Sequence, residues 1–320
     1  MLDVLISLCP ALLVGFFNFG LRALVLTVLS VGTCLLSEWG YTRLVHKKNP
    51  IGDLSAAVTG VLLAMNLPVA APLWIPVIGG VFAIVIVKQL YGGLGKNIFN
   101  PALAARVFLF LAWSALMTRW TLPHTALPLF GSCADAVTGA TPLAALKEGS
   151  TAGLDLFGMF IGQTGGCMGE TSALALLAGG VYLLIRRVIS PRIPAAYLGT
   201  VALLTLLFPR GGNDGFRWML SQLLSGGLML GAIFMATDFT TSPATIGGQW
   251  IYGVGCGIIT VVIRYFGAYN EGVSFAILLM NALVWSIDMV TGPRRYGTHR
   301  FTKLREKLGA RHRGQREAQK

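Results

Sequence analysis

Several long stretches of this sequence carry no charged residue, and this feature limits the possible folds more than any other. The runs are residues 56–67, 73–87, 174–185, 251–263 and 275–287. An α-helix needs about 20 mainly apolar residues to cross a bilayer, and with their flanks several runs approach that length. Only 12% of all residues are charged, against about 25% in soluble domains. The chain is therefore predicted to be an all-α polytopic membrane protein.

Charged residues, glycine and proline divide the apolar runs into ten predicted transmembrane helices. They cover residues 3–18, 21–43, 53–67, 72–90, 99–116, 170–187, 194–208, 220–236, 249–266 and 272–290. No basic leader or cleavage site precedes the first helix, which we therefore expect to be retained. The five cysteines are scattered and form no CxxC pair, so we assign them to packing and expect no metal site.

Lysine and arginine are distributed unevenly over the predicted loops. If the N-terminus is cytoplasmic, 19 of the 25 fall on the cytoplasmic side and six on the outer side, and ten of the 19 follow Pro293. Membrane proteins generally carry their excess of Lys and Arg on the cytoplasmic side. We therefore expect both termini inside and the polar segment 117–169 outside, in the periplasm of a bacterium. The basic tail then needs no nucleic acid as its partner.

The two halves of the chain share short sequence patterns in the same order. Residues 11–22 resemble 175–186, residues 54–57 resemble 224–227, and residues 113–117 resemble 285–289. Because each repeat holds five helices, the second copy must lie upside down in the membrane, as in many transporters. The predicted organisation is a first five-helix repeat at 1–116, an outer loop at 117–169, a second five-helix repeat at 170–292 and a basic cytoplasmic tail at 293–320.

Two predicted helices at matching positions in the halves, 53–67 and 222–236, look too short to cross a membrane comfortably. Discontinuous helices at corresponding places of two repeats point to a pathway near the middle of the bilayer. Asp53 with Ser55 and Asp238 lie at the ends of these helices, and they are our candidate ion contacts. Other charged residues near helix ends, including Lys88 and Arg106, are expected to reach a membrane surface.

The outer loop contains the polar passage Asp135-Ala136-Val137-Thr138-Gly139-Ala140-Thr141. Gly139 permits a positive φ, and Pro142 biases Thr141 toward an extended conformation. Thr141 is either the N-cap of a short helix over 142–147 or a hydroxyl that a modifying enzyme can reach. The residues alone leave both interpretations open.

This passage, of the form D-x-x-[ST]-G-A-T, matches the signature recognised by flavin transferases. From residue 1 to about 295 the chain resembles the RnfD/NqrB family, which includes the D subunit of Rnf ion-translocating complexes and the B subunit of the sodium-translocating NADH:quinone reductase. The stretches MLDVLISLCPALL, KNIFNPA and GETSALALL carry the resemblance together with the DAVTGAT motif. It implies a urea-transporter-like fold of ten helices in two inverted repeats.

The resemblance also implies a cofactor and its attachment point. Thr141 would carry FMN through a phosphoester bond, with Asp135, Thr138, Gly139 and Ala140 recognised by a periplasmic flavin transferase and placed around the flavin. The chain would be a flavoprotein subunit of a bacterial inner-membrane complex that passes electrons between ferredoxin and NAD, coupled to Na⁺ or H⁺ transport. Other subunits would hold the NADH site and iron–sulfur clusters, since this sequence has neither a dinucleotide fingerprint nor a cysteine run.

Two further polar stretches are weaker candidates. Gly169, Thr171 and Ser172 open a helix, where they either hold a phosphate or flavin edge or simply cap the helix. Asn100 before Pro101 has the pattern of an N-cap, and the resemblance adds a second, non-covalent flavin, riboflavin, near this stretch. The alternative to the whole redox interpretation is a channel or carrier for a small polar solute such as urea, which would be indifferent to Thr141→Ala.

Overall fold

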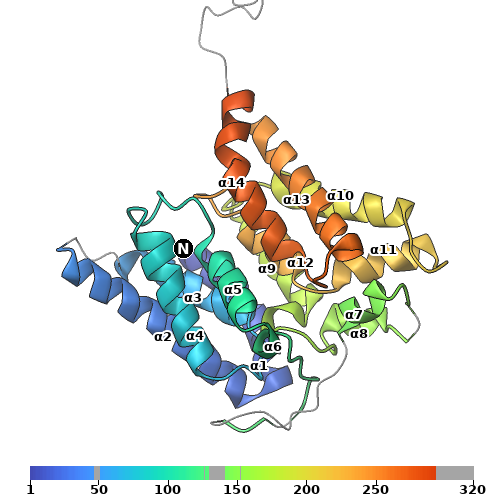
Figure 1. Ribbon diagram of the computed structural model, residues 1–320, viewed down its shortest axis with the longest axis horizontal. Helices are drawn as coiled ribbons and strands as arrows, with labels where there is room; N and C mark the ends of the chain where they lie inside the picture. Colours follow the sequence, from blue (N-terminus) through green and yellow to red (C-terminus); the bar gives the residue numbers. More distant parts are fainter. Residues whose placement is uncertain (47–50, 126, 130–140, 152, 293–320) are drawn as a thin grey trace, which may run out of the picture.

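The computed structural model describes residues 1–46, 51–125, 127–129, 141–151 and 153–292, and within these ranges it is helical without a β-strand. Figure 1 shows α2 to α5 on one side of the molecule and α10, α11, α13 and α14 on the other, with α9 and α12 between them. The predicted recognition residues Asp135, Thr138, Gly139 and Ala140 and the tail 293–320 lie outside the described residues.

Among the described residues, four helices are long and apolar enough to cross a membrane. They are α1 (Leu2–Phe19), α2 (Leu21–Leu44), α13 (Ile246–Phe266) and α14 (Val273–Thr291). Shorter apolar helices accompany them: α3 (Ser55–Met65), α4 (Trp74–Val81) continued by the π-helix η2 (Phe82–Gln89), α5 (Pro101–Ala112), α9 (Ala173–Ile185) and α10 (Arg192–Leu207). The chain is a multi-pass membrane protein, as the composition predicted.

The helix predicted over 220–236 is divided in the structure, which agrees with its interpretation as a discontinuous helix. The segment contains α11 (Gly215–Leu224), then α12 (Leu228–Leu230) continued by the π-helix η4 (Gly231–Met235), and the two parts are bent by 67°. Ser225 is extended and Gly226 has φ +67°, a conformation that favours glycine. Apolar residues recur at helical spacing throughout this segment, but the helix is interrupted at Gly226 and Gly227 near its centre.

The first half contains a comparable interruption before α3. The 3₁₀ turn η1 (Ile51–Asp53) is followed by Leu54 at φ +60°, and α3 begins only at Ser55. The predicted helix over 99–116 is likewise divided, because α5 ends at Ala112 and a separate turn, α6 (Ser114–Met117), follows Trp113. The sequence placed these helices correctly but joined pieces that the backbone separates.

The ends of α3 and η4 meet inside the molecule. Asn66, directly after α3, places its Nδ2 3.6 Å from the sulfur of Met235, the last residue of η4. Asn100 Nδ2 donates to the carbonyl of the same Met235 at 3.3 Å. Around this meeting point α1 packs against α9 and α5 packs against α14. The two halves of the chain therefore share one core.

Short helices occupy the segment between the halves. They are α7 (Pro142–Lys147), α8 (Leu156–Ile161) and the 3₁₀ turn η3 (Met168–Glu170). Figure 1 shows α7 and α8 beside one another next to α11, and contacts join both of them to that helix. The outer segment is thus placed against the second half of the chain.

Candidate functional site

The residue singled out by the sequence motif, Thr141, lines a cavity of about 340 Å³, here called the Thr141 cavity. Its volume falls in the range of roughly 300–1,000 Å³ typical of small-molecule sites. The lining includes three aromatic side chains, two glutamates, and hydroxyl, amide and glycine positions: Phe110, Trp120, Tyr269, Glu170, Glu271, Thr118, Thr164, Asn270, Gly165 and Gly226. These residues come from α5, the segment between the halves, the α11–α12 break and the α13–α14 connection.

Thr141 itself has the extended backbone conformation that the following proline predicted. It is extended, with φ −73° and ψ 153°, and its Oγ1 accepts a hydrogen bond from the backbone N–H of Ala144 at 3.3 Å. The prediction that Thr141 caps a helix over 142–147 is confirmed by α7. The same half-buried residue also faces the cavity, so the capping and the cofactor interpretations are compatible.

Aromatic rings form one wall of the Thr141 cavity. The Tyr269 ring meets Phe110 edge to face at 5.0 Å between centroids and stacks on Phe275 at 5.6 Å. Such packing fixes the rings and offers flat apolar faces. The hydroxyls of Thr118 and Thr164 line the same space. A planar, partly polar ring system is the kind of group that this lining suits.

Glu170 and Glu271 line the Thr141 cavity and pair with the buried Arg106 behind them, contrary to the expectation that charges near helix ends reach a membrane surface. Arg106 is 5% exposed and pairs with Glu170 at 3.3 Å and with Glu271. Glu271 also accepts a hydrogen bond from the backbone N–H of Gly227 at 3.1 Å. We call Arg106, Glu170 and Glu271 the carboxylate cluster.

The glycine-rich run before α9 reaches the Thr141 cavity through Thr164, Gly165 and Glu170. The three residues proposed from sequence have other contacts. Gly169 packs against Met65, and Thr171 donates to the Met168 carbonyl at 3.2 Å. Ser172 caps α9 by accepting from Ala175 N at 3.2 Å. Their contact with a cofactor remains a prediction, while the capping role of Ser172 is confirmed.

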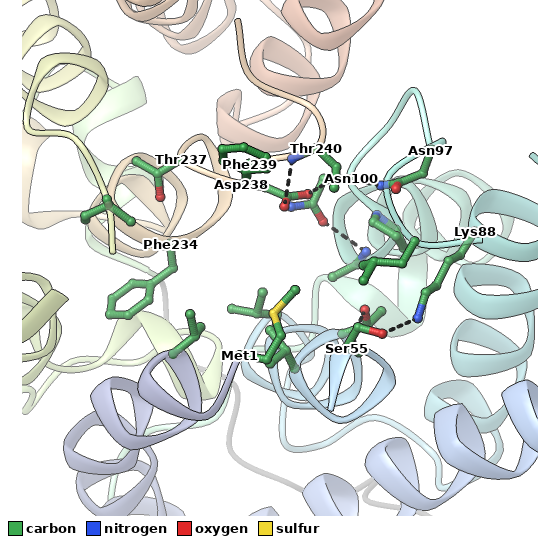
Figure 2. A pocket seen from close by; sticks show the side chains of 18 of the residues that line it. Met1, Ser55, Lys88, Asn97, Asn100, Phe234, Thr237, Asp238, Phe239 and Thr240 are labelled. Atoms are coloured by element: carbon green, nitrogen blue, oxygen red, sulfur yellow. Dashed lines mark hydrogen bonds between the residues drawn. The ribbon is translucent and has the colours of Figure 1, made fainter. Parts of the chain in front are cut away.

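A second cavity, of about 300 Å³, lies between the two halves and is called the Asp238 cavity. Figure 2 shows Asp238, Asn100 and Thr240 on one side of it, with Ser55 and Lys88 on another. Asn100 caps α5 by accepting from Ala102 N and Leu103 N at 3.1 and 3.3 Å, as its sequence pattern predicted. Two candidate ion contacts, Ser55 and Asp238, thus line one cavity although 183 positions separate them in the chain.

Asp238 follows η4 and is held by the residues after it. Its carboxylate accepts from the hydroxyls of Thr240 and Thr241 at 3.1 and 3.3 Å, while burial raises the pKa of Asp238. Asn97 Nδ2 donates to Thr240 Oγ1 at 3.1 Å and so joins the halves. The third candidate, Asp53, accepts from the backbone N–H and hydroxyl of Ser55 at 2.8 and 2.5 Å.

A buried ion pair lies behind Ser55, and sequence reasoning missed its acid. Lys88 Nζ lies 2.6 Å from Glu38 Oε1 and donates to Ser55 Oγ at 2.5 Å. Gln89 Nε2 donates to the same Glu38 oxygen at 2.8 Å. The side chains of Lys88 and Glu38 are 3% and 0% exposed, so Lys88 does not reach a membrane surface as expected. The signal in the sequence was a glutamate inside an otherwise apolar helix.

Comparison with known proteins identifies the family of the chain. The sequence model of the NQR2, RnfD, RnfE family matches residues 1–297. The chain belongs to this family. The resemblance inferred from the sequence motifs is thereby confirmed.

Curated relatives match along nearly the full length. The chain is 48% identical to the D subunit of the Na(+)-translocating ferredoxin:NAD(+) oxidoreductase complex of Acetobacterium woodii, over 95% of this chain and 92% of that one. It is 42% identical to the proton-translocating counterpart of Clostridium ljungdahlii, over 94% and 92%. It is also 42% identical to the D subunit of the ion-translocating oxidoreductase complex of Stutzerimonas stutzeri, over 93% and 91%.

Proposed function

We propose that this chain is the membrane flavoprotein subunit of an ion-translocating ferredoxin:NAD oxidoreductase complex of the Rnf type, with FMN bound covalently to Thr141. The observation that carries the proposal is the position of Thr141, whose side chain caps α7 and lines the Thr141 cavity. The names of the relatives support the type of complex. On this proposal electrons pass between ferredoxin and NAD, coupled to Na⁺ or H⁺ transport, through this and the other subunits.

The residues around Thr141 fit a flavin attached through its phosphate. An esterified Oγ1 keeps lone pairs, so it can still accept the hydrogen bond from Ala144 N–H. The Phe110, Trp120 and Tyr269 rings offer apolar faces to a planar ring, and Thr118 and Thr164 offer hydroxyls to its polar edge. When bound, FMN supplies one- and two-electron transfer, whereas the protein positions it and tunes its electronics.

We place a second, non-covalent flavin, riboflavin, in the Asp238 cavity. The amides of Asn97 and Asn100 and the carboxyl of Asp238 provide polar partners there, and Val58, Leu62 and Phe234 provide apolar ones. Pro101, the first residue of α5, lines this cavity, whereas Phe110 of the same helix lines the Thr141 cavity. Nine helical residues span about 14 Å, so the two flavins would be separated by a short protein segment.

The wider arrangement belongs to the same proposal. Two inverted five-helix repeats would bring the short helices α3 and η4 together from opposite membrane faces, which accounts for the contact of Asn66 with Met235. Both termini would be cytoplasmic, in the bacterial inner membrane, and the flavin-bearing segment would face the periplasm. Asp53, Ser55 and Asp238 remain the predicted ion contacts beside the Asp238 cavity.

The proposal is tested by expressing the chain with and without a flavin transferase, then recording in-gel flavin fluorescence and the mass of the peptide that contains Thr141. We expect a phosphoester-linked FMN on the wild type only when the transferase is present. Thr141→Ala should abolish it completely. Thr118→Ala, which changes another threonine of the same cavity, should retain the covalent flavin.

An unmodified Thr141 in a host that flavinylates other proteins would refute the proposal. A flavin still attached in Thr141→Ala would refute the attachment point. Urea flux in liposomes that is the same for wild type and Thr141→Ala, without any flavin, would instead favour the channel interpretation.

A further inference from the structure

The carboxylate cluster contains one more acid than it contains base. Arg106 directs one nitrogen to Asn66 Oδ1 at 2.9 Å and Ser274 Oγ at 3.1 Å, and the other to Glu170 and Glu271. The side chains of Glu170 and Glu271 are 8% and 17% exposed. With both carboxylates ionised, this buried group would carry an uncompensated negative charge, which is strongly unfavourable away from water.

One further described cation, Arg264, is close enough to attract both glutamates: a Cβ on Gly226 would lie 3.4 Å from its guanidinium and 3.9 Å from Glu271 Cγ. Arg264 donates to Gln222 and Ser225 oxygens at 2.6 to 3.0 Å, and within the described residues it forms no ion pair with either glutamate. Lys147 donates to the Ala268 carbonyl at 2.6 Å and is partly exposed. The other titratable side chains near the cluster are uncharged when protonated: Cys167, Tyr197 and Tyr269.

The two carboxyl groups also lie close to one another. Both accept a hydrogen bond from the same nitrogen of Arg106, and two carboxyl groups placed in this way repel one another unless a proton lies on one of them. A Cβ placed on Gly227 would lie 2.9 Å from a Glu271 oxygen and 3.2 Å from a Glu170 oxygen, so this glycine leaves the room that the pair occupies. Both glutamates line the Thr141 cavity.

We propose that Glu170 and Glu271 form a one-proton site in the wall of the Thr141 cavity, and that its proton occupancy follows the charge of the group bound there. The proton is held on Glu170, because Arg106 lies closer to Glu271. Release leaves Glu170 as a carboxylate, and uptake restores its neutral carboxyl group. The proton site is a property of the chain alone, whereas its response to flavin charge rests on the proposed function.

The electrostatic balance within the pair supports this assignment. Burial, followed by repulsion from Glu271, raises the pKa of Glu170 from 4.5 to about 8. Burial alone would raise the pKa of Glu271 too, but the Arg106 guanidinium and the hydrogen bonds that Glu271 accepts together hold that pKa below its ordinary value. Burial also raises the pKa of the Cys167 thiol, so the thiol stays protonated and adds no charge.

Negative charge in the cavity should strengthen proton binding. A unit charge about 8 Å away, at an effective dielectric constant of about 20, shifts a proton affinity by roughly 1.5 pH units. Reduction of a flavin that gains an electron without a proton would therefore draw a proton onto Glu170, and oxidation would release it. Because Arg106 also bonds Asn66 at the end of α3, the cluster joins the cavity wall to the meeting point of the short helices.

The protonation of Glu170 is tested first without flavin, in the full-length Thr141→Ala chain reconstituted in nanodiscs. Infrared spectra recorded from pH 5 to pH 10 should contain a protonated-carboxyl band that is lost as pH rises through about 8. Adding Glu170→Gln should remove this band, since Glu271 and Arg106 then form a neutral pair. Adding Glu148→Gln, at an exposed position after α7, should leave it unchanged.

The Gly227→Ala variant tests the geometry with both carboxyl groups in place. The added methyl crowds both glutamates, so the pH midpoint of the band should move while the band persists. A Thr141→Ala chain without the band at pH 6, or a band that survives in both Glu170→Gln and Glu271→Gln, would overturn the proton site. Either result would leave covalent FMN on Thr141 unaffected.

The response to charge is tested in the flavinylated chain by measuring the flavin midpoint potential against pH. We expect a potential that falls with pH above about 8, where the oxidised form has released the proton of Glu170 and reduction takes it up again, and a clearly weaker dependence in Glu170→Gln than in Glu148→Gln. Equal pH dependence in wild type and Glu170→Gln would overturn the coupling. If no flavin is attached, the proposed function fails, while the infrared experiment still decides the proton site.

Discussion

Glu38 and Lys88 form a buried ion pair behind the Asp238 cavity. Glu38 Oε1 receives hydrogen bonds from Lys88 and Gln89, whereas its Oε2 has no partner among the described residues. A buried pair of this kind contributes little compared with apolar residues of similar size, but removing one partner leaves a buried charge uncompensated. Replacing one partner should therefore lower the free energy of unfolding far more than replacing both partners by apolar residues.

We expect Glu38→Gln to destabilise the chain by about 3–5 kcal/mol, because Lys88 would remain charged without its counter-ion. The double variant Glu38→Met with Lys88→Met should recover most of that loss. Thermal unfolding in detergent, followed by circular dichroism, measures both effects. Glu148→Gln serves as the exposed control, and a Glu38→Gln chain that unfolds at the wild-type temperature would contradict the prediction.

Some residue roles could be predicted because their causes are local. Asn100 and Thr141 each precede a proline, and both cap the helix that follows. The ionic contacts could not be predicted in this way. Glu38 and Lys88 are 50 positions apart, and Arg106 and Glu271 are 165 apart, while sequence periodicity gives no distance between helices. A charge within an apolar run indicates burial or function, but it does not identify the partner.

At the level of helices, α1 and α9 approach one another closely through small residues. A Cβ on Gly179 of α9 would lie 2.1 Å from the backbone oxygen of Ser7 in α1. Gly15 of α1 is similarly close to Met168, with 2.6 Å between its Cβ position and that side chain. Small residues at such crossings let helix backbones meet in membrane proteins. The pair thus depends on contacts that an added methyl group would disrupt.

Gly179→Ala is therefore expected to destabilise the chain by about 1–3 kcal/mol, the usual cost of overpacking. Backbone atoms of α1 would have to move, since the nearest atom is a carbonyl oxygen and no side chain can rotate away. Gly199→Ala in α10 is the matched control, because a Cβ there meets no described atom within 4 Å. It should be neutral or slightly stabilising. Equal unfolding temperatures for the two variants would show that α1 and α9 are less tightly packed than described.

The break between α11 and α12 shows a limit of helix prediction at this scale. Apolar periodicity continues across residues 220–236, whereas the backbone turns by 67° at Ser225 and Gly226. Arg264 Nη2 donates to the Ser225 carbonyl at 3.0 Å, so this carbonyl has a partner although the helix is broken there. Two adjacent glycines were a local signal for the break. The hydrogen bond from Arg264, which lies 39 positions away and stabilises the break, could not be predicted from the sequence.

Across the whole molecule, the two cavities lie at opposite ends of α5. Pro101, the first residue of α5, lines the Asp238 cavity, and Phe110, near the end of the helix, lines the Thr141 cavity. If α5 lies across the membrane, the cavities face its two sides. The distribution of lysine and arginine then predicts which side each one faces.

Sidedness is tested with single cysteines introduced into a chain whose natural cysteines are replaced by serine or alanine. Glu148→Cys, after α7, should react with a membrane-impermeant maleimide in intact cells, because the segment that carries Thr141 is predicted to lie outside. Arg187→Cys, after α9, should react only after lysis, since that connection carries the positive charge that stays in the cytoplasm. Both positions are exposed, so accessibility to solvent does not explain a difference. The reverse pattern would place Thr141 on the cytoplasmic face, where a periplasmic transferase cannot reach it.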